Sequence, residues 1–148
     1  DFTYYTNREG LTVAGAFSLL DSELTKKLVP TNDVIVGSDM AFAPEMQFNL
    51  RFRQEWEMSN GKLGHAQLQV THSDDSYSDI MEMNKALNDS YTYMDVRLGM
   101  SNDVMTAELY IDNVTDERAV ISNTFVFDRQ RVSYNRPTTV GIRYKKNF

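Results

Sequence analysis

Four arginines offer the clearest ligand-binding chemistry in this sequence of 148 residues. Arg51, Arg53, Arg97 and Arg143 each stand at a polar position of a segment in which polar and apolar residues alternate. A guanidinium group binds carboxylates and phosphates through paired N–H donors, so these side chains would favour an anionic ligand. The acidic residues at polar positions of the same segments are expected to pair with them; they are Glu55, Asp95 and Glu108.

Other reactive residue types are too few or too scattered to form a catalytic or metal centre. The sequence has no cysteine, which excludes disulfides, cysteine-ligated zinc and thiol catalysis. It has two histidines, His65 and His72, and only His72 lies near carboxylates, those of Asp74 and Asp75. No spacing suggests a nucleophile, a base and an orienting acid held together. We therefore predict no enzymatic activity, no cofactor and no metal centre.

The charge and the apolar content exclude further classes of protein. The chain carries 15 Lys+Arg against 21 Asp+Glu, a formal net charge of -6. A nucleic-acid binder needs a basic face to replace the counterions on phosphates, so no nucleic-acid partner is expected. The longest nearly apolar stretch, residues 11–20, is too short for a transmembrane helix, which needs ~20 residues.

The elements that must position the arginines are strands, because the residues alternate with a period of two. From Met46 to Trp56 the even positions are apolar except for Gln54, and the odd positions are all polar. A helix, with a period of 3.6 residues, would mix the two sets. The same alternation predicts an all-β antiparallel fold of seven strands, over residues 2–6, 11–19, 46–56, 64–71, 90–100, 105–112 and 139–145.

The connections between these strands alternate in length. Three are tight and polar, at 7–10, 59–62 and 101–103, and the middle one contains Asn60-Gly61, a dipeptide favoured in type I′ hairpin turns. Three are long, at roughly 23–44, 73–89 and 115–134. Short turns on one rim and long loops on the other are typical of outer-membrane β-barrels, whereas most connections in compact soluble domains are short.

The alternation alone also fits a soluble antiparallel sheet whose apolar face covers a core. Three features favour lipid as the neighbour of the apolar face. The polar faces carry many long charged side chains, which suit a water-filled lumen, and the chain ends on a strand with the aromatic Phe148. Aromatic residues also gather near strand ends, as in the girdles of membrane barrels; these are Tyr4, Tyr5, Trp56, Tyr91, Tyr93, Tyr134 and Tyr144.

Four segments resemble parts of TonB-dependent outer-membrane receptors. They are 41–45, 91–99, 108–117 (with Asn113-Val114-Thr115) and 135–144 (with Arg136-Pro137). The first resembles the start of an earlier barrel strand in that family, and the other three resemble its last three strands. The resemblance covers most of the chain, best from Phe42 onward. Lys146 departs from the pattern, because the family usually carries an aromatic or aliphatic residue there.

The resemblance implies that residues 1–148 form the last seven strands of a 22-stranded transmembrane barrel, whose plug domain and earlier strands are absent from this sequence. It implies a bacterial outer-membrane protein in contact with lipid and lipopolysaccharide. It also implies uptake of a scarce ligand, usually a ferric siderophore and sometimes cobalamin or a glycan, driven by TonB through the absent N-terminal region. Tyr144 and Phe148 would serve barrel closure and recognition by the outer-membrane assembly machinery.

The strand count favours a partial barrel. Bacterial single-chain barrels have an even number of strands and both termini on the periplasmic rim, yet seven strands place Asp1 on the opposite rim. Open sheet edges would also leave backbone groups unpaired in hydrocarbon, at several kcal/mol each. We therefore expect the remaining strands to precede Asp1. The alternatives are a small autonomous outer-membrane barrel of structural or adhesive role, with an eighth strand near 33–38, and a soluble ligand-binding β-barrel.

The long loops carry two further groups of candidates. An acidic group would either bridge lipopolysaccharide through divalent cations or form a solvated loop; it comprises Asp74, Asp75, Asp79 and Glu82. A second group would either touch a ligand or extend strands above the membrane; it comprises Phe125, Phe127, Arg129 and Arg131. The predicted ligand path consists of the four strand arginines together with Tyr93 and Arg129.

Overall fold

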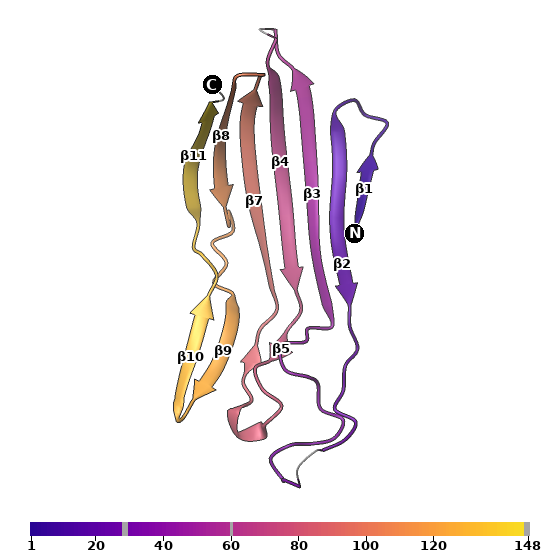
Figure 1. The fold of residues 1–148 in the computed structure, drawn as a ribbon, viewed down its shortest axis with the longest axis vertical. Helices are drawn as coiled ribbons and strands as arrows, with labels where there is room; N and C mark the ends of the chain where they lie inside the picture. The colour runs from indigo at the N-terminus through magenta and orange to yellow at the C-terminus, as the bar shows by residue number, and fades with distance from the viewer. Residues whose placement is uncertain (28–29, 60, 147–148) are drawn as a thin grey trace.

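Seven strands form one antiparallel sheet in the order β1-β2-β3-β4-β7-β8-β11 (Figure 1). The structure is a computed structural model that describes residues 1–27, 30–59 and 61–146. Every predicted strand is present, with ends that differ by two residues or fewer, so the predicted antiparallel all-β fold is confirmed. The strands are β1 (Phe2–Tyr5), β2 (Leu11–Leu19), β3 (Met46–Glu57), β4 (Leu63–Ser73), β7 (Tyr91–Ser101), β8 (Met105–Asp112) and β11 (Thr139–Lys146).

The register aligns residues of one kind in rows across the sheet, because successive side chains point to opposite faces. One apolar row runs through Phe52, Leu68, Val96, Ile111 and Val140, each opposite the next on the neighbouring strand. The adjoining row on the other face runs through Arg53, Gln67, Arg97, Tyr110 and Gly141. A slip of one residue would exchange the two faces, so the alternation specifies the register.

The apolar face of the sheet has no protein layer over it in the described part of the chain. Among the described residues only Ala14 and Ala119 are buried apolar residues, and neither lies on this face, since Ala14 is opposite Arg51 and Ala119 is in the loop after β8. Large apolar side chains stay exposed, from 37% for Val96 to 79% for Ile142. Because burial of one such side chain stabilises a protein by about 1.5–3 kcal/mol, this face requires an apolar covering that the described residues do not supply.

Short and long connections lie on opposite rims of the sheet, as the sequence predicts (Figure 1). The short-turn rim joins β1 to β2, β3 to β4 and β7 to β8. Two of its turns use glycine at positive φ, which side chains disfavour: Gly10 has φ 74° and Gly61 has φ 72°. Asn60, the predicted partner of Gly61 in a type I′ turn, lies outside the described residues.

The long-loop rim contains short ladders within its loops. Between β4 and β7, the strand β5 (Ser76–Tyr77) pairs with β6 (Leu87–Asn88), and the 3-10 turn η1 (Glu82–Asn84) lies between them. Between β8 and β11, the strands β9 (Val120–Val126) and β10 (Arg129–Tyr134) form a hairpin. Phe125, Arg129 and Arg131 lie in these strands, as the strand-extension interpretation requires, but Phe127 lies in the turn between β9 and β10 with φ 59°, so 125–129 is not one continuous strand.

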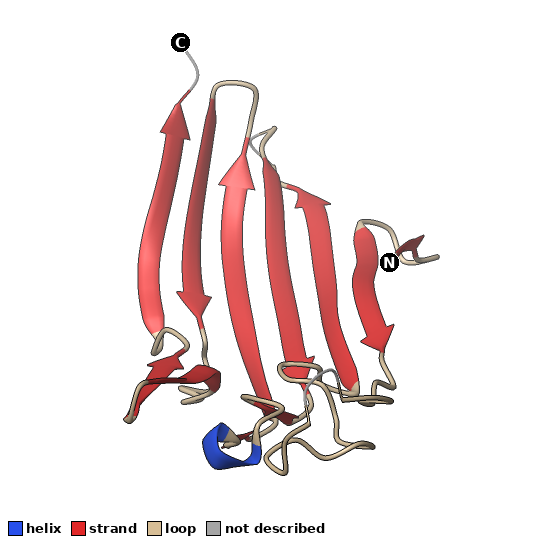
Figure 2. Ribbon diagram, turned by 60° about the horizontal axis from the view of Figure 1, so that its bottom comes forward, coloured by secondary structure: helices blue, strands red, loops and turns tan. Residues whose placement is uncertain are grey.

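The stretch 33–38 forms no strand. Val34 makes one isolated bridge to Met81, and Gly37 has φ 90°. The eighth strand that the small-barrel alternative needs is therefore not formed there. The sheet is a single open layer with β1 and β11 at its edges, and the described residues close no barrel (Figure 2). Within the described ranges, no helix has the length and apolar character to cross a bilayer.

Candidate functional site

Charged side chains on the polar face of the sheet converge on Glu108 of β8. Arg143 and Arg97 donate to one carboxylate oxygen at 3.1 and 3.4 Å, and His65 Nε2 lies 3.2 Å from the other oxygen. Arg97 also donates to Asp112 at 3.3 Å. The register explains this convergence, because Glu108 lies directly opposite Arg143 and four neighbouring strands present polar residues on the same face. We call Glu108, Arg97, Arg143, His65 and Asp112 the polar-face cluster.

Gly99 makes room for this cluster. It lies between His65 and Glu108 in their cross-strand row, and a Cβ at Gly99 would stand 2.5 Å from the His65 ring. The ring covers the glycine backbone, and His65 is only 3% exposed. A glycine within a strand often marks such a close approach, so the glycine permits the burial of the histidine.

The Tyr110 ring lies close to both arginines of the cluster. The ring centroid lies 5.9 Å from the guanidinium carbon of Arg97 and 5.7 Å from that of Arg143. The same ring covers Gly141, whose added Cβ would collide with the tyrosine. A guanidinium near an aromatic face is favourable by about 0.5–1 kcal/mol at exposed sites, so Tyr110 helps to position both arginines.

The predicted ligand-path arginines on the strands are mostly paired within the chain. Arg53 donates to Glu55 at 2.8 Å and to Gln67 at 3.3 Å. The predicted pairing of Glu55 and of Glu108 with arginines is therefore confirmed. Arg51 forms no ion pair among the described residues. Because carboxylates of the same sheet neutralise three of these four guanidinium charges, the strand arginines give little support to the expected preference for an anionic ligand.

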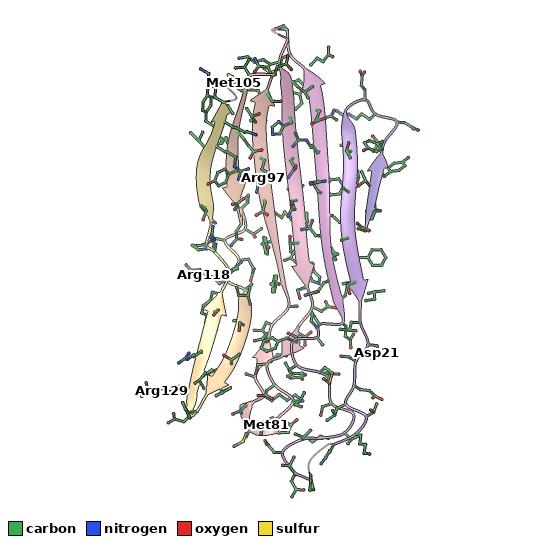
Figure 3. All side chains as sticks on the ribbon, viewed as in Figure 1. Asp21, Met81, Arg97, Met105, Arg118 and Arg129 are labelled. Carbon is green, nitrogen blue, oxygen red and sulfur yellow. The ribbon has the colours of Figure 1, made fainter. Side chains whose placement is uncertain are left out.

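Tyr93 and Arg129 lie apart from the polar-face cluster. Tyr93 stacks on Tyr91 with 6.2 Å between ring centroids, on the half of the sheet nearer the long loops. Arg129 begins β10 at the end of the β9–β10 hairpin, beyond the sheet (Figure 3). The structure thus divides the predicted ligand path into separate groups, and the part of each in ligand binding stays a prediction.

Of the two residues predicted to serve barrel closure, Tyr144 lies within the described part of the chain. Tyr144 lies on the apolar face of β11, opposite Ala107, and is 60% exposed. Phe148 lies outside the described residues. Their roles in closure and assembly remain predictions.

Asn113 joins the two ends of the loop between β8 and β11, a role that its sequence motif did not indicate. Its side-chain amide donates to the carbonyls of Glu117 at 3.0 Å and Arg136 at 2.9 Å, and its side-chain oxygen accepts from the Glu117 N–H at 3.0 Å. Its own N–H donates to the carboxylate of Asp95 at 2.8 Å. The predicted pairing of Asp95 with an arginine is therefore wrong. Asn113 is 3% exposed and has φ 53°, a conformation that asparagine tolerates better than most residues.

Thr138 completes this junction from the β11 side. Its hydroxyl donates to the Asn113 carbonyl at 2.7 Å, and its N–H donates to the Asp116 carboxylate at 3.1 Å. The Thr138 N–H lowers the pKa of the Asp116 carboxyl below its ordinary value, since the bond favours the ionised form. Hydrogen bonds therefore join the first residues of the loop after β8 to the last residue before β11.

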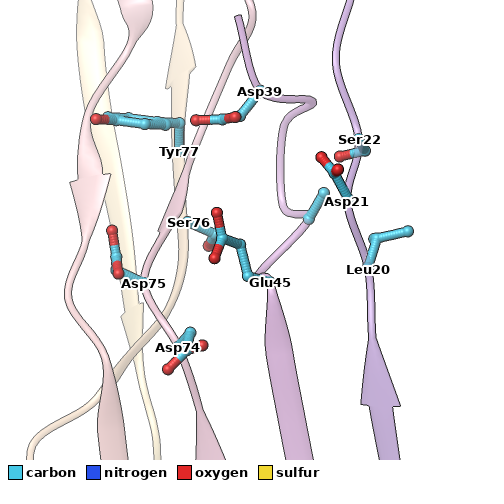
Figure 4. A pocket seen from close by; sticks show the side chains of 10 residues that line it. Leu20, Asp21, Ser22, Asp39, Glu45, Asp74, Asp75, Ser76 and Tyr77 are labelled. Carbon is cyan, nitrogen blue, oxygen red and sulfur yellow. The ribbon is translucent and has the colours of Figure 1, made fainter.

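A cavity at the long-loop rim is lined by five carboxylates (Figure 4). Its volume is about 180 Å³, and the acidic residues are Asp21, Asp39, Glu45, Asp74 and Asp75. They come together because the loops after β2 and after β4 are hydrogen-bonded to each other, as from the Phe42 N–H to the Tyr77 carbonyl at 2.8 Å. We call this space the acidic cavity.

Only two of the four acidic loop residues that the sequence analysis grouped together line the acidic cavity. Asp74 and Asp75 line it, whereas Asp79 accepts the N–H of Met81 at 3.0 Å and Glu82 pairs with Lys85 at 3.2 Å. Spacing along the chain could not reveal the partners from the other loop. Among the described residues, no three Asp, Glu or His side chains are arranged to hold a metal ion.

A second cavity, of about 110 Å³, adjoins the first and shares Asp74 and Ser76 with it. Asn88 and Asp89 also line this adjoining cavity. Asn88 is 5% exposed, and its side-chain oxygen accepts no hydrogen bond from the described residues. Such a buried acceptor is costly to leave unpaired, so Asn88 marks a place for a hydrogen-bond donor.

Comparisons with known proteins support the fold. No family model matches the sequence, and no curated protein matches it. Among solved structures, the siderophore receptor PiuA from Acinetobacter baumannii is similar, with a TM-score of 0.70 and 17% sequence identity. The similarity covers 93% of this chain and 19% of the receptor chain. The seven-stranded sheet therefore has the fold of a section of that receptor, and this chain spans about a fifth of its length.

Proposed function

We propose that this chain forms part of the wall of a bacterial outer-membrane receptor that imports a scarce ligand, an iron–siderophore complex, in a TonB-dependent manner. The observation that carries the proposal is the contrast between the two faces of one sheet. One face exposes rows of large apolar side chains, and the other holds an ion-paired cluster around Glu108. A barrel wall between lipid and a wet lumen accounts for both faces, because lipid covers the first and water solvates the second.

The two rims support an orientation in the membrane. The short turns would face the periplasm, and the long loops would face outward, where they meet ligand and lipopolysaccharide. The loop ladders and the β9–β10 hairpin would then stand above the membrane surface.

The open edges of the sheet support a partial barrel. The strands β1 and β11 each have a neighbour on one side only, which leaves backbone N–H and C=O groups unpaired. Because such groups are costly in hydrocarbon, we infer that other strands of the same protein pair with both edges. TonB would act on a region outside this chain, and the fold of the siderophore receptor PiuA is consistent with this arrangement.

The proposed role is transport rather than catalysis. The polar-face cluster would line the lumen and hold its shape, since Arg97, Arg143 and His65 from three other strands are bound to carboxylates of β8. The long loops would bind the ligand.

Uptake by living cells tests this function. The intact protein would be expressed in a Gram-negative strain lacking its own siderophore receptors, and ⁵⁵Fe uptake would be measured with hydroxamate, catecholate and carboxylate chelates. We expect uptake of at least one chelate, and none when TonB is deleted. Absence of uptake for the whole panel, with the protein present in the outer membrane, would contradict the proposal.

A further inference from the structure

The net charge of the chain lies entirely on the long-loop rim. The three long-loop segments, residues 20–45, 74–90 and 113–138, hold 13 acidic and seven basic residues, whereas the strands and short turns hold eight of each. The first two segments alone hold ten acidic and three basic residues. A ligand that approaches this rim meets a negative potential, which attracts cations and repels anions.

The acidic residues of this rim differ from those of the sheet in having few partners. Glu55, Glu108 and Asp112 on the sheet each pair with an arginine. In the acidic cavity, no ion pair of the described residues reaches the carboxylates of Asp21, Asp39, Glu45 or Asp75.

The two basic side chains nearest the acidic cavity, His72 and Lys85, do not neutralise most of its negative charge. Asp74 has one oxygen 3.1 Å from His72 Nε2. Lys85 lies 4.3 Å above the centre of the Tyr77 ring, but its ammonium group pairs with Glu82, outside the cavity lining. Neither cavity has a lysine or arginine among the described residues that line it.

Asn88 gives an independent indication of a ligand. Asn88 as a whole residue is 95% removed from solvent, yet its side-chain oxygen has no donor among the described residues, and it lines the cavity that adjoins the acidic one at Asp74 and Ser76. Gln47 and Tyr91, which line the same cavity, add further polar groups. The site therefore offers negative charge and a free acceptor side by side, and it calls for a group that is positively charged and rich in N–H donors.

We propose that the acidic cavity and its neighbour bind a protonated amine carried by the transported ligand. This inference rests on the proposed function for the identity of the ligand, but not for the amine site itself. The carboxylates line the cavities without three of them converging on one point, which suits an ammonium group with three separate donors better than a metal ion. The cavities are smaller than the ~300–1,000 Å³ of typical ligand pockets, so they would take one arm of the ligand while the iron-bearing part stays outside.

A pair of chelates that differ only in the amine tests the proposal. One is an iron(III) trihydroxamate that ends in a free amine, and the other is the same chelate with that amine acetylated. Binding to the intact protein in detergent would be measured by calorimetry, with spermidine as an iron-free probe. We expect the amine form to bind about tenfold tighter, spermidine to compete with it, and 0.5 M salt to weaken both.

Isosteric variants locate the effect. Asp21→Asn combined with Asp75→Asn removes two charges from the cavity with little change in shape, and should abolish the preference for the free amine. Glu23→Gln is the matched control, because Glu23 lies in the same loop but lines neither cavity, and it should leave the preference intact. Asn88→Ala, checked for folding by its heat-dependent gel mobility, should weaken binding of the amine form several-fold.

The outcomes separate the two proposals. Spermidine binding that is lost in the double variant, without binding of any chelate, supports the amine site and contradicts the siderophore function. Equal binding of both chelates, unchanged in the double variant, overturns the amine site and leaves the siderophore function standing. Failure of spermidine and of both chelates to bind also overturns the amine site.

Discussion

The side-chain amide of Asn113, at the end of β8, donates a hydrogen bond of 2.9 Å to the carbonyl of Arg136, which precedes β11. The loop of more than twenty residues between them is thereby closed at its base, independently of the hairpin at its tip. Three further hydrogen bonds to the same buried side chain, involving Thr115 and Glu117, make Asn113 the centre of this closure.

Asn113→Ala should loosen the loop base. The change leaves the Arg136 carbonyl and the Glu117 N–H and carbonyl without their partners, and an alanine at φ 53° adds strain, so we expect a loss of about 2–4 kcal/mol. Limited proteolysis should cut residues 115–134 at least tenfold faster. Asn32→Ala, in an exposed loop position, is the control; equal cleavage of both variants would refute a closing role for Asn113.

Trp56 should report which solvent meets the apolar face. It is the only tryptophan of the sequence, lies over Gly64 on that face and is 40% exposed. In bilayers of the intact protein we expect brominated lipid to quench a signal that Trp56→Phe removes. Quenching by aqueous iodide instead of lipid would contradict the membrane orientation of the sheet.

Leu109→Arg should harm folding far more than an arginine on the polar face. Leu109 lies between Leu98 and Ile142 in an apolar row, and an arginine at the lipid face of a barrel costs about 2–4 kcal/mol near the midplane. Gln69→Arg, between Arg51 and Asp95 on the polar face, is the control. Folded protein would be measured by heat-dependent gel mobility; equal yields would show that the apolar face is not in lipid.

Glu108→Gln should destabilise the sheet more than Glu55→Gln. The Glu108 side chain is 11% exposed and serves Arg97, Arg143 and His65, whereas the Glu55 side chain is 38% exposed and serves one arginine. We expect losses of about 1–3 kcal/mol and under 1 kcal/mol, respectively, because exposed ion pairs are screened by water. Urea unfolding of the two variants in detergent measures the difference. A larger loss for Glu55→Gln would show that the cluster does not stabilise the sheet.

Acid should open the loop base through Asp116. Its pKa is lowered by the hydrogen bond from the Thr138 N–H, so its contribution is complete above the ordinary value of 3.8 and is lost as pH falls through the lower value of the folded protein. Hydrogen exchange at the Thr138 amide, corrected for the intrinsic pH dependence, should therefore show constant protection from pH 5 to 8 and a drop below about pH 4. Asp116→Asn should remove that pH dependence, and an unchanged profile in this variant would assign the acid response to another group.

Much of the fold follows from local rules. From Met46 to Trp56, alternation alone predicts a strand and the face that each side chain takes, because successive side chains of a strand point to opposite sides whatever lies beside it. Short polar turns such as 101–103 also predict hairpins from neighbouring residues alone, because a chain reversal of that length has few possible conformations. The small ladders of β5–β6 and β9–β10 were not predicted as pairs, because their pairing depends on how each long loop folds back on itself.

The sequence by itself therefore determined the strands, their two faces and the rim on which each connection lies, all of which depend on residues close together in the chain. Only the tertiary structure decided that Glu108 gathers Arg97, Arg143 and His65, that Asp95 binds Asn113 instead of an arginine, and that Asp21 and Asp74 line one cavity. These contacts between distant residues depend on strand register and on the paths of separate loops. Hydrogen bonds and charges act over a few ångströms in space, and no pattern of neighbouring residue types encodes which distant partners the fold brings within that range.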